Sequence, residues 1–140
     1  MHVEIFTLCD AATVDAAGKL NILGSFDRLN AASEPIVHMQ CALALKLRFA
    51  RIEEGQKRFR LAFVDSDGKA VMQPLDGTTE VRFQDQDSTS TVSMALGIQQ
   101  LRLPKFGEYS IDLAIDGRHE ASIPLFVKPP ISSNPSNPLP

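Results

Sequence analysis

The sequence is poor in the residues that mark several protein classes. It contains no tryptophan, one tyrosine and two cysteines among 140 residues, so a disulfide-rich secreted scaffold is excluded. No apolar run approaches the ~20 residues that a membrane-spanning helix needs, and no membrane partner is expected. The formal net charge is −3, which argues against the basic surface that nucleic-acid binding requires.

The chain has the length and composition of one folded domain. At 140 residues and 44% hydrophobic residues, it can bury a real core and is not disordered by composition. Residues 1–6 lack the basic and long apolar regions of a signal peptide. We therefore expect a cytoplasmic protein in which Cys9 and Cys41 are buried free thiols. A disulfide between them is an open alternative.

Apolar residues recur at every second position over much of the chain. In residues 37–49 the apolar side chains take every odd position: Val37, Met39, Cys41, Leu43, Leu45, Leu47 and Phe49. A strand places alternate side chains on opposite faces of a sheet, so this segment predicts one core face and one wet face. The segment exceeds the usual strand length of ~3–10 residues, and we expect a bend or bulge within it.

The same alternation predicts further strands at residues 3–9, 20–26, 59–63, 92–98, 109–115 and 123–127, with short ones near Val71 and at 81–83. Asp65-Ser66-Asp67-Gly68 and Asp116-Gly117 are hairpin signals, because Asp and Gly accept the φ values of tight turns. No amphipathic helix of useful length is present. The sequence predicts an all-β fold, a two-sheet antiparallel β-sandwich of Ig-like or Greek-key type with about eight or nine strands.

One motif predicts a specific contact within this fold. Gly107-Glu108-Tyr109 follows a turn and opens a strand, as in the tyrosine corner of Greek-key sandwiches, where the phenol bonds to upstream backbone. We expect Tyr109 to fix such a corner.

The domain is predicted to span residues 1–127. Residues 128–140 change character, since they hold five of the nine prolines, with Ser and Asn between them. We expect this tail to be extended or disordered.

Catalytic signatures are absent from the sequence. It contains no G-x-S-x-G elbow, no phosphate loop and no G-x-G-x-x-G. His2, His38 and His119 have none of the spacings of metal ligands. We therefore predict no catalytic residues, no metal and no cofactor, and a protein that is not an enzyme. An enzyme with an unrecognised site is kept as an alternative.

Asp65-x-Asp67-Gly68 is superficially similar to the start of a calcium-binding loop. Its next ligand position is Lys69, which cannot coordinate a cation, so a polar hairpin is favoured. Carboxylates in several loops could still converge at one end of a sandwich, and a loop-based ligand or calcium-binding domain is a second alternative. Those carboxylates are Asp10, Asp65, Asp67, Asp85, Asp87 and Asp116.

The outward positions of the predicted strands carry an uneven charge. The cations that point outward are Lys46, Arg48, Arg58, Arg60 and Arg82, and they form our candidate binding face. If residues 37–49 and 59–63 pair as a hairpin, the cations of these two strands would face one another. Like charges across neighbouring strands repel, which is unfavourable without a partner of opposite charge.

Acidic residues occupy the outward positions of two other strands, at Asp112, Asp116 and Glu120. The simplest explanation is that acidic and basic strands neutralise each other within one sheet. The alternatives are an interface with an acidic protein or with another copy of the chain, and a site for a small anionic ligand.

Several segments resemble an uncharacterised bacterial family of small cytoplasmic β-sandwich proteins, a domain of unknown function. They are Val3-Glu4-Ile5-Phe6-Thr7-Leu8-Cys9-Asp10-Ala11-Ala12, Gly18-Lys19-Leu20-Asn21-Ile22-Leu23-Gly24-Ser25-Phe26-Asp27, Arg51-Ile52-Glu53-Glu54-Gly55 and Gly107-Glu108-Tyr109-Ser110-Ile111-Asp112-Leu113-Ala114-Ile115-Asp116-Gly117. The resemblance covers residues 3–127. It supports the fold and implies no active site.

The function is therefore unknown from the sequence. The features together favour a non-catalytic binding or assembly module that acts through charged sheet faces or sheet edges.

Overall fold

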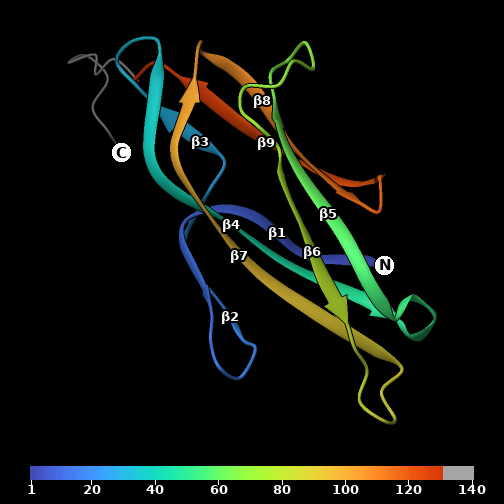
Figure 1. Cartoon of the computed structure of the whole chain (residues 1–140). Coiled ribbons are helices and arrows are strands. Elements are labelled where there is room, and N and C mark those ends of the chain that lie inside the picture. The colour runs from blue at the N-terminus through green and yellow to red at the C-terminus, as the bar shows by residue number, and fades with distance from the viewer. Residues whose placement is uncertain (131–140) are drawn as a thin grey trace, which may run out of the picture.

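The computed structural model describes residues 1–130 and contains nine strands in two sheets (Figure 1). The four-stranded sheet has the order β2-β1-β4-β7 and contains β1 (His2–Val14), β2 (Leu20–Phe26), β4 (Ile36–Ala50) and β7 (Thr89–Leu103). The five-stranded sheet has the order β3-β9-β8-β5-β6 and contains β3 (Arg28–Asn30), β5 (Gly55–Val64), β6 (Leu75–Val81), β8 (Gly107–Ile115) and β9 (Arg118–Lys128). Within residues 1–130 the only helical segment is a 3₁₀ turn, η1 (Arg51–Glu53).

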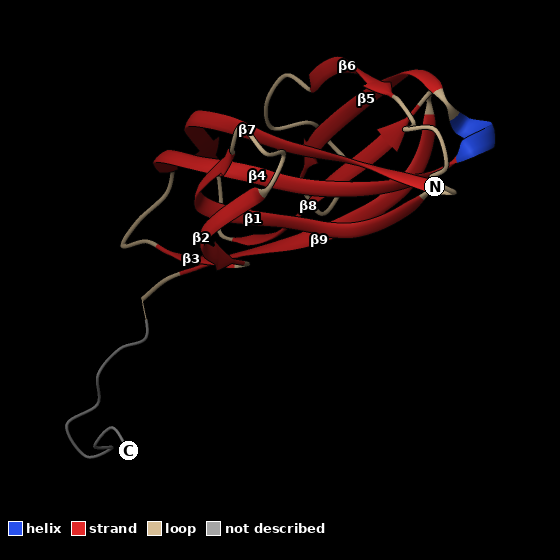
Figure 2. Ribbon diagram, turned by 90° about the horizontal axis from the view of Figure 1, so that it is seen from below, coloured by secondary structure: helices blue, strands red, loops and turns tan. Residues whose placement is uncertain are grey.

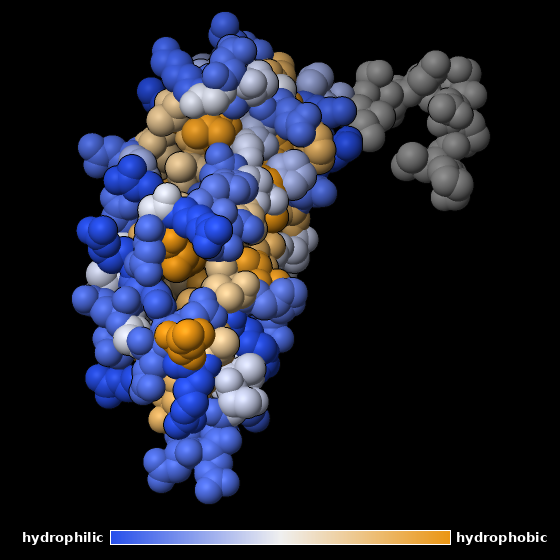
Figure 3. Space-filling model, turned by 90° about the vertical axis from the view of Figure 1, so that its right-hand side faces the viewer, coloured by the Kyte–Doolittle hydropathy of each residue, from blue (hydrophilic) through white to orange (hydrophobic). Residues whose placement is uncertain are grey.

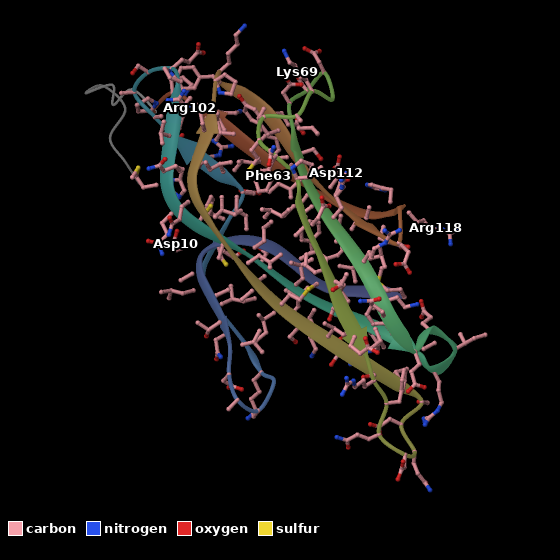
Figure 4. All side chains as sticks on the ribbon, in the orientation of Figure 1. Asp10, Phe63, Lys69, Arg102, Asp112 and Arg118 are labelled. Carbon is pink, nitrogen blue, oxygen red and sulfur yellow. The ribbon has the colours of Figure 1, made fainter. Side chains whose placement is uncertain are left out.

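The two sheets share one core. Leu43, Leu45 and Leu47 of β4 belong to the same buried cluster as Leu61 and Phe63 of β5. Figure 4 shows Phe63 between the sheets, and Figure 2 shows the layers edge-on. The prediction of an all-β fold with about eight or nine strands is confirmed. No helix among residues 1–130 is long and apolar enough to cross a membrane.

Strand pairing is antiparallel with one exception, which the sequence did not reveal. β3 runs parallel to β9 over three residue pairs, from Arg28–Phe126 to Asn30–Lys128. β3 follows β2 after Asp27, whose carbonyl accepts the Phe126 amide at 2.7 Å. The chain changes sheets at Asp27, so this short strand enters the second sheet in a direction set by the first.

β4 is bent, as its length predicts, but the prediction that Val37 and Met39 face the core is wrong. Val37 is 42% exposed and Met39 63%, whereas Ile36 is buried. The paired strand β7 has Gln100 at φ 53° next to this point. β7 changes phase at the same point, since Ile98 is buried before Gln100 and Leu101 and Leu103 are buried after it, so both paired strands exchange faces together.

The predicted hairpin turns are present. Asp116 and Gly117, at φ 50° and 80°, join β8 to β9. One carboxylate oxygen of Asp65 accepts the amides of Asp67 and Lys69, both at 2.9 Å. This capped loop leads to a bridge between Val64 and Ala70, where the sequence predicted a short strand. The boundary predicted at residue 127 falls beside Lys128, the last residue of β9, and residues 131–140 of the predicted tail lie outside the described residues.

Candidate functional site

The five cations of the candidate face are divided between the two sheets. β4, with Lys46 and Arg48, lies in the four-stranded sheet, and β5, with Arg58 and Arg60, lies in the five-stranded sheet. Arg82 follows β6 and is exposed. β4 and β5 therefore do not pair as a hairpin, which is the arrangement in which their cations would have faced one another. The apolar faces of both strands are buried in one shared core, so their outward residues point away from that core on different sheets.

On the four-stranded sheet, Arg48 and Lys46 share the carboxylate of Glu4 of β1. Arg48 donates from Nε and Nη2 to the two carboxylate oxygens of Glu4, at 3.0 and 3.1 Å, and Lys46 Nζ lies 3.9 Å from the same carboxylate. The hydrogen bond from Arg48 is the main cause that lowers the pKa of Glu4. Arg48 also donates to Thr89 Oγ1 at 2.8 Å. This pair is satisfied within its own sheet.

On the five-stranded sheet, Asp76 of β6 neutralises Arg60 in the same way. Nε and Nη2 of Arg60 donate to the two carboxylate oxygens at 2.7 and 3.1 Å. Arg60 and Asp76 are directly opposite on neighbouring strands. The hydrogen bond from Arg60 lowers the pKa of Asp76. Arg48 and Arg60 are thus each paired with an acidic residue on the neighbouring strand of the same sheet.

Arg58 differs from its neighbours. Its backbone amide donates to Asp116 Oδ1 at 2.9 Å, and Asp116 Oδ2 lies 3.9 Å from Lys57 Nζ. Within residues 1–130 the guanidinium of Arg58 has no acidic partner within 4.0 Å. Arg58 borders a hollow of about 620 Å³ that is lined also by the ion pair of Arg60 and Asp76, by Thr78 and by small residues. A guanidinium at the rim of a hollow can bind a small anion.

A cluster of hydrogen-bonding side chains on β8 and β9 was missed by the sequence analysis. Ser110 and Ser122 both donate to Asp112 Oδ1 at 2.6 Å, and His119 Nε2 lies 2.8 Å from Ser122 Oγ. The register slips between Leu113 and Ala114. Counting back from the Asp116-Gly117 turn therefore pairs the wrong residues, and no local pattern reveals the cluster.

The order of this cluster differs from that of a hydrolytic triad. In a Ser-His-Asp triad the histidine lies between the acid and the serine and takes the serine proton. Here Ser122 lies between Asp112 and His119, and its hydroxyl donates a hydrogen bond to Asp112 Oδ1. His119 therefore lies beside the Ser122 hydroxyl without acting as its base, and the hydrogen bonds of the cluster join β8 to β9.

Residues 4–128 match the model of a family of unknown function, DUF6941. The chain belongs to this family. The DUF6941 match runs from β1 into the last residue of β9, so the family unit is the whole two-sheet structure. This match confirms that the chain is an uncharacterised domain, as the resemblance in the sequence indicated. No curated protein matches the chain.

In this DUF6941 member both thiols are free and buried. Cys41 belongs to the main core, whereas Cys9 packs with Ala42 and Ala44 in a separate cluster. Burial raises the pKa of the Cys41 thiol to about 11. It also raises the pKa of the Cys9 thiol above its ordinary value. Because the thiolate is the reactive form, these are structural cysteines. The prediction of buried free thiols is confirmed in the structure.

The loop acids do not converge. Among residues 1–130 no three or more His, Cys, Asp or Glu side chains are grouped to hold a metal ion. Asp10 lies on β1, and Figure 4 shows it far from Lys69 in the loop that Asp65 caps. Asp65 already accepts two backbone amides through one oxygen.

Proposed function

We propose that this DUF6941 chain is a non-catalytic binding module that assembles through an edge of its four-stranded sheet. The observation that carries the proposal is β7. This strand has 15 residues, and within residues 1–130 it pairs only with β4 and forms one edge of the sheet. None of residues 89–101 is charged or proline. An edge strand presents unpaired N–H and C=O groups, which another strand can bind.

The edge is favoured over the charged faces because Arg48 and Arg60, two of the five face cations, are already paired through bidentate hydrogen bonds. Arg48 binds Glu4, and Arg60 binds Asp76, each through two hydrogen bonds. Exposed ion pairs of this kind contribute little energy, and an acidic partner would have to displace them. The open backbone of β7 has no such competitor in residues 1–130.

A non-enzymatic role also agrees with the Asp112 cluster, whose order gives Ser122 no histidine base. We propose in addition that the two sheets form an Ig-like sandwich, since they share one core and Tyr109 binds backbone at a corner. A cytoplasmic location in a bacterial cell is consistent with two free, buried thiols.

The test is light scattering coupled to size-exclusion chromatography, in low and in high salt. Association through backbone pairing should give a multiple of the 15.3 kDa chain mass that persists in high salt, because salt screens charges and leaves hydrogen bonds and apolar contacts in place. An assembly that dissociates in high salt would instead indicate the charged faces. The mass of one chain in both buffers would contradict the proposal.

A second candidate rests on Arg58 alone. Arg58 borders the 620 Å³ hollow, whose one carboxylate, Asp76, is already paired with Arg60, so the unpaired cation could take a small anion. Inorganic phosphate should then raise the melting temperature of the native chain, because a ligand that binds only the folded state stabilises it. The matched variant Arg58→Gln should lose this shift. An equal shift in both proteins would remove the candidate.

A further inference from the structure

The four sheet edges of the structure are not protected equally. β3 has three residues. β2 has seven and is interrupted by Gly24 at φ 68°. β6 has seven and carries Asp76 and Glu80. Short length, irregular backbone and charge are the devices that keep edges from pairing. β7, with 15 residues and its first charge at Arg102, has none of them along most of its length.

We infer that two copies of the chain pair through β7, antiparallel and about a two-fold axis at Ala95, so that the two four-stranded sheets become one sheet of eight. The inference rests on the proposed function and deepens it by naming the partner as a second copy. A two-fold contact uses the same patch on both copies and therefore closes both edges at once.

The sequence of β7 is symmetric in character about Ala95. On the core face, Val92 would lie opposite Ile98 of the second copy, and Met94 opposite Leu96. These four residues face the core, and three of them are only partly buried. Apolar side chains would therefore meet apolar side chains and cover what one copy leaves open.

The opposite face of β7 is equally self-compatible. Thr91 would lie opposite Gln99, and Ser93 opposite Gly97, so polar or small residues meet polar or small ones. Residues 91–99 precede Gln100, whose positive φ distorts the strand, although the pairing with β4 continues to Leu103. At the other end the Ser90 hydroxyl donates to the Arg82 carbonyl at 2.7 Å, so a loop of the same copy lies against that end of the strand. The open segment is thus centred on Ala95.

Charges at the two ends of the strand favour the same arrangement. Arg102 lies near the C-terminal end of β7 and is exposed, and Asp85 and Asp87 lie in the loop before its N-terminal end. Figure 4 shows Arg102 at the end of β7 remote from that loop, which Figure 1 places between β6 and β7. Antiparallel pairing brings Arg102 of each copy opposite Ser88 of the other, beside Asp87. A parallel arrangement would place like charges together.

The apolar side chains along the β7 edge are incompletely covered. Val92, Met94 and Leu96 are each only partly buried, because β7 is the last strand of its sheet. On the face turned toward the right of Figure 1, apolar residues lie in small groups between polar ones (Figure 3).

The experiment uses the full chain and two double variants that differ only at residue 99. Thr91 and Gln99 are exposed, so glutamate at Thr91 is tolerated by a single copy, where Arg48 is the opposite residue. Thr91→Glu with Gln99→Glu places two like-charged pairs across the axis. Thr91→Glu with Gln99→Lys places two opposite-charged pairs there. Asn21→Glu, on the exposed edge of β2, is the control for added charge.

Analytical ultracentrifugation should show a wild-type dimer, and the Glu/Glu variant should dissociate at about tenfold higher concentration or more, since it creates two like-charged pairs. The Glu/Lys variant and Asn21→Glu should remain dimers. Circular dichroism checks that each variant is folded. If the Glu/Glu variant dimerises like the wild type, or the Glu/Lys variant dissociates as the Glu/Glu variant is expected to, the pairing about Ala95 is wrong, although assembly through β7 in another register would stand. A monomeric wild type would overturn both.

Discussion

The phenol of Tyr109 closes on the backbone of Lys105. Its hydroxyl donates to the Lys105 carbonyl at 2.6 Å and accepts the Lys105 amide at 3.2 Å. The Tyr109 side chain is buried in the core, so one residue joins the start of β8 to the turn before it. This is the corner that the sequence predicted from Gly107-Glu108-Tyr109.

Replacing Tyr109 with phenylalanine should destabilise the fold by about 1–2 kcal/mol. The ring keeps its packing, but two hydrogen bonds to part-buried backbone are lost. Urea unfolding followed by circular dichroism measures the change, and an unchanged m-value would show that only stability was altered. A variant as stable as the wild type would mean that the corner bond contributes nothing.

Two glycines on different strands should respond in opposite ways to alanine. A Cβ at Gly77 would lie 2.5 Å from Cζ of the buried Phe59 ring, so Gly77→Ala should cost about 1–3 kcal/mol by overpacking. A Cβ at Gly97 meets nothing within 4 Å, and Gly97→Ala should be neutral or stabilise by about 0.5–1 kcal/mol. Thermal unfolding of both variants is the measurement, and equal effects would contradict the packing at Phe59.

Cys41 should be unreactive in the native protein at mildly alkaline pH. Burial raises the pKa of its thiol to about 11, so the native state keeps the proton while the unfolded state loses it near pH 8.5. Stability should therefore fall as pH rises from the unfolded pKa to the native one. Alkylation of Cys9→Ala, with and without denaturant, isolates Cys41. Rapid modification of the native variant would be inconsistent with its burial.

The pKa of Asp76 should depend on Arg60. The hydrogen bonds from Arg60 lower it, so the ionised carboxylate contributes stability above its unfolded pKa, and this contribution is lost as pH falls through the lower native value. Carboxyl NMR titration should show a higher pKa for Asp76 in Arg60→Gln. Arg58→Gln is the matched control, because Arg58 makes no bond to Asp76 in the described structure. An unshifted Asp76 in Arg60→Gln would count against the ion pair.

Local alternation predicted those strands that bury one full face. Leu61 and Phe63 of β5, and Ile111 and Leu113 of β8, are all fully buried as expected, because a period of two is dictated by the strand itself. It failed at Val37 and Met39, where the strand turns. β3 has only three residues and escaped detection, as did most of β6, whose glycine and polar residues hide the pattern.

The candidate site depended on strand order, which local sequence does not encode. Glu4 and Arg48 are 44 residues apart and meet because β1 pairs with β4. Arg48 and Arg60 are close in sequence, yet they lie on different sheets. The uncharged run before Arg102 was visible in the sequence, but only the topology shows that β7 is an edge.

The account is tested most directly by amide hydrogen exchange of β7 at low and high protein concentration. Alternate amides of residues 91–99 face the open edge in one copy, so pairing with a second copy should slow their exchange as concentration rises. The Glu/Glu variant at Thr91 and Gln99 should show no such slowing. Exchange in β7 that is fast and independent of concentration in the wild type would contradict pairing at this edge.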